Sequence, residues 1–469
     1  MSTARLYVVV PGIGGSVLER PGGVPLWGRV GTTASAVLHP AGLEMAQEVV
    51  PVGLMPSTSV CSWTLVPGYD RLVQGLMNSL RLGPADVDVA RPDRAPSPEA
   101  SVLLFPYDFR QSMAVNAERL RLEVDRRAAG RRVVVVAHSM GGLVAQWWWA
   151  VLGGHAVCDR LVTVGTPHRG APKALDWLLN GIRLGPSPIA EGTSRLLGAA
   201  SGVLAQWDST WELLPRYPAV LEGGVARYPH QVSVAPESFR RRAEAAYQRH
   251  LLLEKHHAAV LRSDASLRRR TMVFYSSGHA TPGRAVVDGS RVRVERGDAE
   301  WLPGKGWEGG DGTVPAIAVT PVEDGQQADE PLVDGRTWSP DTHMRIASTP
   351  GLVEYVTRFD AASLAAVRGE PNPAVPWVAF DQDEVWAVGE HVEIRATLRG
   401  ADPSGVRARF RLFPEHGGPA ELDVRRDGQT WASVVLGAPA GVHRVRVELD
   451  HVPGVDRVVG ETQFGVVPL

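Results

Sequence analysis

The sequence predicts an α/β protein with a doubly wound, mostly parallel sheet, followed by a smaller all-β domain. Short apolar runs alternate with helical patterns over the first two thirds of the chain, which is typical of a parallel sheet covered by helices on both faces. After a proline-rich segment the apolar residues recur at every second position, as in an antiparallel sandwich. The 469 residues also exceed the roughly 250–300 that one core usually organises, so two domains are expected.

Five apolar runs, each followed closely by Gly, Pro or Ser, predict the buried strands of the parallel sheet. They cover residues 6–10, 101–105, 132–137, 160–164 and 271–275. Between the second and the third, residues 116–129 have helical spacing, with Leu120, Val124 and Ala128 on one face and Gly130 at the expected C-cap. Right-handed crossovers then produce an open, doubly wound sheet.

A proline-rich linker at 369–376 separates a first domain, 1–368, from a second, 377–469. In the second domain apolar and polar residues alternate, as at Val392, Ile394, Ala396 and Leu398, and turn signals separate the runs. This pattern predicts a β-sandwich of about seven strands, immunoglobulin-like in size.

The third predicted strand ends in a nucleophile-elbow pattern. Residues 133–144 run from four consecutive valines through Ala137, Ser139 and Gly141 into an apolar helix start. Such a turn raises the serine hydroxyl above the sheet, and it requires small residues two positions before and after the serine. The sequence therefore predicts an α/β-hydrolase fold with Ser139 as nucleophile. The alternative is a glycine-rich turn with an ordinary serine, and His138 is expected to be a packing or turn residue.

The acid and base of a catalytic triad follow the nucleophile along the chain in this fold. Asp311 lies in the glycine-rich segment 309–315, and His343 precedes a helical pattern at 352–367. We expect His343 to take the proton of Ser139, and Asp311 to orient and stabilise the imidazolium.

Two other residues are weaker candidates. Asp341 is too close to His343 in sequence to come from a separate strand end, and His279 precedes Asp311, which is the wrong order. The alternative for Asp311 itself is a turn aspartate that only stabilises its own backbone.

Two backbone N–H groups should form an oxyanion hole. Met140 directly follows the nucleophile and is the first expected donor. The second is expected from the glycine-rich loop 10–16, where we assign Ile13, because glycines let the backbone approach a substrate closely. Phosphate binding is the alternative for this loop, but it lacks the Lys-Ser/Thr ending of a P-loop.

Two segments are too long for simple connections and are expected to fold over the active site. A lid is predicted at about 39–70, where four prolines interrupt any helix, and a cap at about 171–266, which is helix-leaning and rich in Trp, Leu and Arg. The alternative is surface insertions with no role in catalysis.

Charge and composition exclude other classes. A net charge of −2 without a basic block argues against nucleic-acid binding. Cys61 and Cys158 fit neither zinc nor redox spacing, so free thiols are expected, with a single bridge as the alternative. The adjacent His256 and His257 lack a metal motif, so we expect no metal and no cofactor. The first apolar run is too short for a signal peptide, no transmembrane span is evident, and a cytoplasmic protein is expected.

Five motifs follow one another along the chain at residues 11–16, 105–110, 137–142, 165–168 and 311–315. In this order they resemble the lecithin:cholesterol acyltransferase family, which includes phospholipases A and lysosomal acyltransferases. The resemblance covers roughly residues 5–360, and the segment 105–110 is its most specific part. It implies an acyl-enzyme at Ser139 with transfer to water or an alcohol, and it supports the assigned acid and base.

The resemblance also implies a role for Trp63, which is similar to a lid tryptophan that contacts acyl chains and the membrane in the family. Family lids are closed by a short-range disulfide, and no second cysteine lies near Cys61. This lid therefore departs from the family pattern, and a core tryptophan is the alternative for Trp63.

The leading hypothesis is a serine esterase or lipase acting on an acyl ester, with a lipid substrate and transient contact of the lid with a membrane surface. An O-acyltransferase is one alternative. A binding or effector module targeted by its β-sandwich, whose partner the sequence does not identify, is another. The apolar residues of the cap suit either an acyl pocket or the cap's own core: Trp177, Leu178, Leu179, Trp207, Trp211, Leu213 and Leu214.

Overall fold

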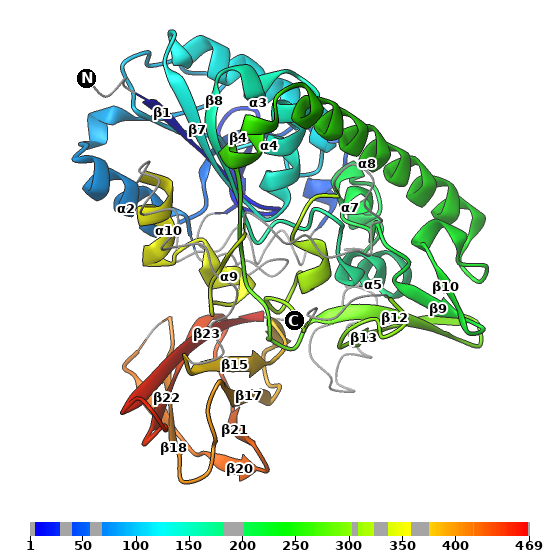
Figure 1. Ribbon diagram of the computed structural model, residues 1–469, viewed down its shortest axis with the longest axis vertical. Helices are drawn as coiled ribbons and strands as arrows, with labels where there is room; N and C mark the ends of the chain where they lie inside the picture. The colour runs from blue at the N-terminus through cyan, green and yellow to red at the C-terminus, as the bar shows by residue number, and fades with distance from the viewer. Residues whose placement is uncertain are drawn as a thin grey trace.

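A sheet of seven parallel strands forms the centre of the first domain (Figure 1), in the order β14-β11-β8-β7-β1-β6-β5. The computed structural model describes residues 5–28, 40–56, 68–181, 201–302, 308–322, 336–357, 375–415 and 417–467. The strands are β1 (Arg5–Val10), β5 (Val87–Val89), β6 (Val102–Leu104), β7 (Arg132–His138), β8 (Cys158–Val164), β11 (Thr271–Tyr275) and β14 (Arg336–Trp338). All five predicted strands are present, and the predicted α/β fold class is confirmed.

Helices cover both faces of this sheet. On one face α3 packs against α4, and α4 packs against α8, while α2 and α10 pack together on the other (Figure 1). The helices are α2 (Asp70–Leu80), α3 (Met113–Ala128), α4 (Met140–Ala150), α5 (Pro172–Asn180), α7 (Asp208–Glu212), α8 (Glu237–Ser263), α9 (His343–Ile346) and α10 (Pro350–Thr357). The predicted helix at 116–129 begins three residues earlier, because the Ser112 hydroxyl caps it by accepting the Val115 N–H. Its left-handed C-cap is Ala129, with φ 46°, and not the Gly130 that follows.

The predicted lid and cap regions contain different kinds of structure. The described part of the lid contains β4 (Val50–Leu54), which pairs with β2 (Ser16–Arg20) in a small sheet completed by β3 (Val24–Trp27). In the cap region, α5 and α7 lie near the pocket described below, whereas the long helix α8 packs along α4 and α7.

A four-stranded sheet that lies partly within the cap region was not predicted. It joins β9 (Val220–Glu222), β10 (Val225–Arg227), β12 (Pro282–Asp288) and β13 (Arg291–Arg296). Asp288 pairs with Arg291, so the hairpin of β12 and β13 turns at Gly289, with φ 58°, and Ser290. A Gly-Ser pair between two valine-containing runs is a hairpin signal, so the sequence contained the information needed to find this hairpin.

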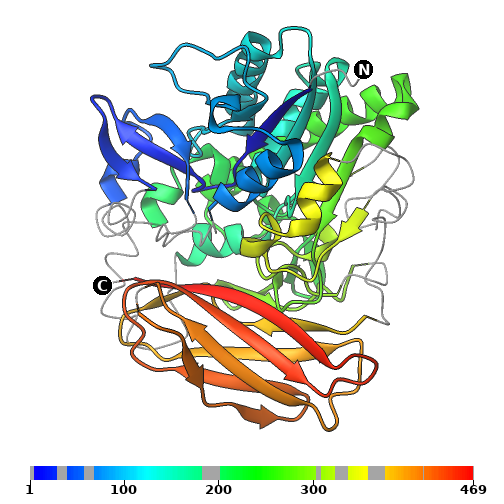
Figure 2. The same ribbon diagram turned by 90° about the vertical axis from the view of Figure 1, so that its left-hand side faces the viewer.

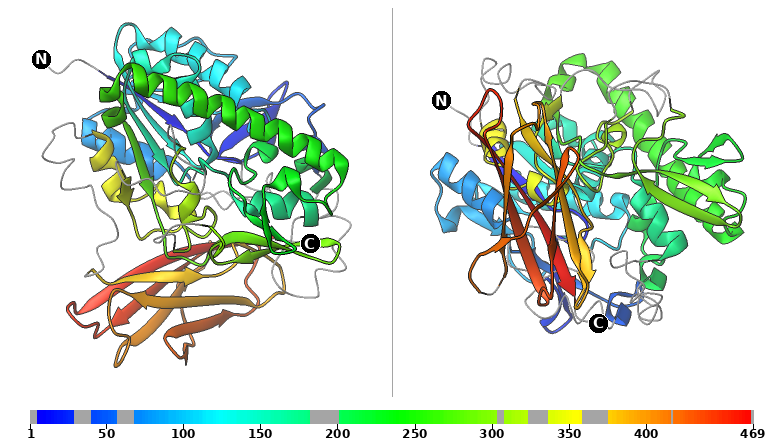
Figure 3. Two further views of the ribbon diagram at one scale, coloured as in Figure 1. Left: turned by 45° about the vertical axis from the view of Figure 1, so that its right-hand side comes forward. Right: turned by 90° about the horizontal axis from the view of Figure 1, so that it is seen from below.

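The second domain is a sandwich of two sheets. One has the order β15-β17-β21-β20 and the other β16-β23-β22-β18-β19, which makes nine strands within 375–415 and 417–467 where about seven were predicted. The strands are β15 (Trp377–Asp381), β16 (Val385–Ala387), β17 (Val392–Arg399), β18 (Arg407–Phe413), β19 (Ala420–Leu422), β20 (Arg425–Asp427), β21 (Thr430–Val435), β22 (Gly441–Asp450) and β23 (Arg457–Val467). The sandwich lies against the side of the first domain toward which the parallel strands run (Figures 2 and 3). Most of the predicted linker, 369–376, lies outside the described residues.

Two further observations concern the described residues only. None of their helices is both long and apolar enough to cross a membrane. Cys158 lies fully buried on β8 as a free thiol, and its burial raises the pKa of that thiol to about 12, whereas Cys61 falls outside the described ranges.

Candidate active site

Ser139 lies in the sharp turn between β7 and α4. Its backbone has φ 53° and ψ −130°, a strained conformation for a residue with a side chain. The turn is held by the Ser139 N–H, which donates to the carbonyl of Val164 at 2.8 Å. A Cβ added at Gly141 would stand 2.2 Å from the Pro11 carbonyl oxygen, so this position must be glycine for the turn to pack against the first loop. The sequence pattern predicts a small residue at position 141, and the close approach of the Pro11 carbonyl oxygen explains why it is needed.

The structure brings Ser139, His343 and Asp311 together in one hydrogen-bonded row. The Nε2 atom of His343 lies 3.0 Å from the Ser139 hydroxyl, and its Nδ1 lies 2.6 Å from Asp311 Oδ2. The other oxygen of Asp311 accepts the backbone N–H groups of Thr313 at 3.0 Å and Val314 at 2.7 Å. All three side chains are buried. The carboxylate therefore has donors on both oxygens and can hold the imidazole with Nε2 facing the serine.

The two weaker candidates for acid and base have other partners. The Asp341 carboxylate accepts the hydroxyls of Ser339 at 2.7 Å and Thr349 at 2.5 Å. His279 places Nε2 3.0 Å from the Pro340 carbonyl, while its Nδ1 accepts the N–H of Phe380. Burial lowers the pKa of His279 to about 4, so this ring is neutral near pH 7. The hydrogen bonds of the His279 ring thus join it to Pro340 and Phe380.

The predicted oxyanion donors belong to two elements that meet at the serine. Met140 is the first residue of α4, and the first N–H groups of a helix have no acceptor within it. Ile13 lies on the loop after β1, which is anchored by the Tyr107 hydroxyl donating to the Pro11 carbonyl at 2.8 Å. A Cβ added at Gly12 would stand 2.8 Å from Ser139 Cβ, so the loop passes directly beside Ser139.

A buried bridge that the sequence did not reveal joins this loop to His343. The Nε2 atom of His138 faces the His343 carbonyl at 3.1 Å and must therefore carry its hydrogen. The Nδ1 atom of His138 is then an acceptor for the Tyr69 hydroxyl at 2.9 Å, and that hydroxyl oxygen accepts the Gly12 N–H at 2.8 Å. Burial lowers the pKa of His138 to about 3, which keeps the ring neutral in this role.

The family-specific segment 105–110 also connects the site to the lid region. Arg110, 1% exposed, pairs with Asp108 at 2.8 Å and donates to the carbonyls of Glu44 at 2.6 Å and Gln47 at 3.0 Å. The segment therefore holds the first loop through Tyr107 and the described lid residues through Arg110.

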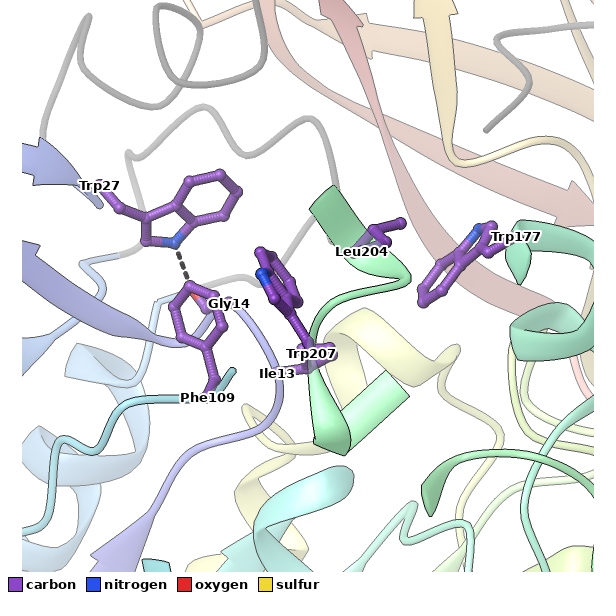
Figure 4. Close-up of a pocket in the computed structure, with 7 residues that line it drawn as sticks. All are labelled: Ile13, Gly14, Trp27, Phe109, Trp177, Leu204 and Trp207. Carbon is purple, nitrogen blue, oxygen red and sulfur yellow. Dashed lines mark hydrogen bonds between the residues drawn. The ribbon is translucent and has the colours of Figure 1, made fainter. Parts of the chain in front are cut away.

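An apolar pocket lies beside the loop that carries Ile13 (Figure 4). The indole N–H of Trp27 donates to the Gly14 carbonyl and that of Trp207 to the Leu43 carbonyl, each at 2.8 Å, so both rings present carbon to the pocket. The walls are formed by Ile13, Gly14, Trp27, Phe109, Trp177, Leu204 and Trp207.

The tryptophans of the predicted cap divide between the two expected roles. Trp177 and Trp207 line the pocket, whereas Trp211 packs against Phe239 of α8 with ring centroids 5.2 Å apart. Trp63, the predicted lid tryptophan, lies outside the described residues. Within the described ranges no group of three or more His, Cys, Asp or Glu side chains is arranged to hold a metal ion.

Two solved structures that the chain resembles are distant from it in sequence. The mature form of the Bacillus licheniformis lipase BlEst2 is 14% identical, with a TM-score of 0.28, and the match covers 60% of this chain and 69% of that one. Its propeptide form is 12% identical with a TM-score of 0.30, covering 98% and 92%. TM-scores this low do not establish a shared fold, so the fold is identified from the sheet order described above.

Comparison by sequence is more informative at the level of the family. No curated protein matches the chain significantly. Residues 97–269, which include Ser139, match the family model described as lecithin:cholesterol acyltransferase. This match supports a lipase- or acyltransferase-type activity on lipids. The resemblance to the lecithin:cholesterol acyltransferase family that the motifs indicated is confirmed over residues 97–269.

Proposed function

We propose that the protein is a serine esterase or lipase that cleaves an acyl ester, with a lipid as the fitting substrate class, through an acyl-enzyme on Ser139. The observation that carries this proposal is the row of Ser139, His343 and Asp311, with contacts of 3.0 and 2.6 Å, close to the loop that borders an apolar pocket. The family match over residues 97–269 supports lipid esters over other esters.

The proposed reaction follows from the positions of these groups. His343 removes the Ser139 proton through Nε2 while the hydroxyl oxygen attacks the ester carbonyl, and Asp311 stabilises the imidazolium that results. The backbone N–H groups of Ile13 and Met140 stabilise the oxyanion. Collapse of this intermediate expels the alcohol, which takes the proton from His343. Water, activated in turn by His343, then releases the acid from Ser139.

The lining of the pocket favours an acyl chain. Its walls consist of indole, phenyl and aliphatic carbon, as in the mostly apolar pockets that bind small ligands. A hydrocarbon chain gains by transfer into such a pocket, at about 0.8 kcal/mol per buried methylene.

A series of p-nitrophenyl esters of rising acyl length tests the proposal. We expect kcat/KM to rise from acetyl toward longer acyl chains, and Ser139→Ala to be inactive throughout. Activity confined to acetyl esters would contradict a lipid substrate.

Acyl transfer is the second candidate, because the matching family model is that of an acyltransferase. A long-chain alcohol added to the ester assay distinguishes the two reactions. A new ester formed at the expense of free acid would favour transfer, whereas an unchanged yield of acid would favour hydrolysis.

A further inference from the structure

The first strand of the sandwich is attached to the part of the hydrolase domain that carries the catalytic acid. The Phe380 N–H donates to His279 Nδ1 at 3.0 Å, and the Ala280 N–H donates to the Phe380 carbonyl at 3.1 Å. The Trp377 ring lies so close to Gly278 that a Cβ there would stand 2.6 Å from it. The neighbouring His279 forms an isolated β-bridge with Gly310, the residue before Asp311. Hydrogen bonds, a ring contact and a β-bridge therefore connect the sandwich to the loop that carries Asp311.

Glu384, which follows this strand, reaches the acid loop with its carboxylate. One oxygen accepts the Thr313 hydroxyl, and the other contacts the Lys173 ammonium at the start of α5. Thr313 in turn donates its backbone N–H to Asp311 Oδ1. The Glu384 side chain is only 15% exposed, so little water competes for these bonds. A residue of the sandwich is thus two hydrogen bonds from the catalytic acid.

The charge of this carboxylate is maintained by its surroundings. Burial alone would raise the pKa of Glu384, but the Lys173 ammonium, with hydrogen bonds from Lys173 and Thr313 and the nearby His343 ring, lowers this pKa below its usual value. Glu384 is therefore an anion at neutral pH, and its charge acts on His343 as well as on Lys173.

The sandwich also holds the loop of the catalytic base. Arg345, two residues after His343 in α9, forms an ion pair with Glu461 of β23 at 2.7 Å. Both side chains are 16% exposed. The acid loop and the base loop are thus each tied to the same sandwich, one through Glu384 and the other through Glu461.

We propose that the sandwich is part of the catalytic unit and that Glu384 is a positioning residue of the proposed serine hydrolase. Through Thr313 it fixes the loop that presents Asp311, and its negative charge stabilises the imidazolium of His343 during the reaction. This inference rests on the proposed function. A sandwich that served only to recognise a partner would not need a buried carboxylate joined to the acid loop.

Full-length variants separate the charge of Glu384 from its hydrogen bond. Glu384→Gln keeps an oxygen that can accept the Thr313 hydroxyl but removes the charge, and Thr313→Val removes the hydroxyl but leaves the charge. The matched control is Asp383→Asn, which neutralises the adjacent carboxylate. That carboxylate is half-exposed, and among the described residues it pairs only with the exposed Arg296.

The readouts are kcat, KM and the pH profile of kcat/KM on the best soluble ester, together with the thermal midpoint. A displacement of about 1 Å can cost roughly 100-fold in rate, and the remaining Val314 bond to Asp311 limits the movement, so we expect roughly tenfold lower kcat in Thr313→Val with KM and the acidic limb unchanged. Glu384→Gln keeps the hydrogen bond but loses the negative charge, which disfavours the imidazolium, so kcat falls and the acidic limb of the profile moves to lower pH. Asp383→Asn should match the wild type.

Wild-type kcat and an unmoved acidic limb in Glu384→Gln would overturn the inference. A loss of kcat that occurs only together with a lower thermal midpoint would also overturn it, because a purely structural role predicts that pattern. These outcomes require an active wild type. An inactive wild type whose Ser139 does not react with a fluorophosphonate would contradict the proposed function instead, so the two failures are distinguishable.

Discussion

Replacing Tyr69 by phenylalanine removes one buried hydroxyl and nothing else from the bridge beside Ser139. In the structure that oxygen accepts the Gly12 N–H at 2.8 Å and its hydrogen is directed to His138 Nδ1 at 2.9 Å. Tyr69 is 1% exposed, so water cannot readily replace the hydroxyl. Tyr69→Phe therefore leaves a donor and an acceptor without their partner.

The cost follows from these two groups. A buried polar group that loses its hydrogen bond costs about 1–3 kcal/mol, so the two groups together cost roughly 2–6 kcal/mol if nothing rearranges. Some relaxation of the loop is expected, which places the loss in the free energy of unfolding at roughly 3 kcal/mol. The same relaxation moves Gly12, and with it the proposed donor Ile13, so the reactivity of Ser139 should fall as well.

Tyr217→Phe provides the matched control. Tyr217 is also fully buried, but its hydroxyl makes a single bond of 3.1 Å to the Gly283 carbonyl. We expect this variant to lose about 1–2 kcal/mol and to keep the wild-type rate of phosphonylation at Ser139. Urea unfolding followed by tryptophan fluorescence measures the first quantity, and the time course of fluorophosphonate labelling measures the second. If Tyr69→Phe were labelled at the wild-type rate and were no less stable than Tyr217→Phe, the bridge would have no role in holding the loop.

Three further predictions use other contacts. Gly141→Ala forces a Cβ to 2.2 Å from the Pro11 carbonyl oxygen and should slow Ser139 labelling and cost about 1–3 kcal/mol, whereas Gly202→Ala, with no atom within 4 Å of the new Cβ, should do neither. Leu204→Ala enlarges the apolar pocket and should shift the preferred ester to a longer acyl chain; an unchanged preference would place the acyl chain elsewhere. The free energy of unfolding should fall as the pH drops from about 6.5 toward 4, because the unfolded chain then binds more protons than the folded one; stability that is flat over this range in urea titrations would contradict it. Burial lowers the pKa of the responsible histidines to about 3 (His138 and His168) or about 4 (His250, His257 and His279).

The parallel sheet could be predicted because its strands are short, nearly continuous apolar runs, and β-branched residues favour buried strands. The elbow at Ser139 could be predicted for a steric reason, since the turn admits only small residues at positions such as Gly141. The order of acid and base along the chain predicts Asp311 and His343, and the structure places His343 beside Ser139 and Asp311 beside His343.

The bridges around the site could not be found in this way. Tyr69 and His138 are separated by 69 positions, and Glu384 lies 71 positions from Thr313 and 211 from Lys173. Each of these side chains fits a solvated or packing role equally well when the sequence is considered alone, because their partners are set by tertiary packing and not by local pattern. His138 was therefore interpreted as a packing or turn residue, and the structure adds the hydrogen bonds that this interpretation lacked.

Labelling with a fluorophosphonate, followed by digestion and mass spectrometry of the adduct, tests the central proposal most directly. Such a probe reacts with a serine only when a base has activated it, so no substrate need be known. The account predicts one adduct on Ser139 in the wild type, and none in Ser139→Ala or His343→Ala. A folded wild-type protein that gives no adduct at Ser139, or one labelled equally well in His343→Ala, would contradict it.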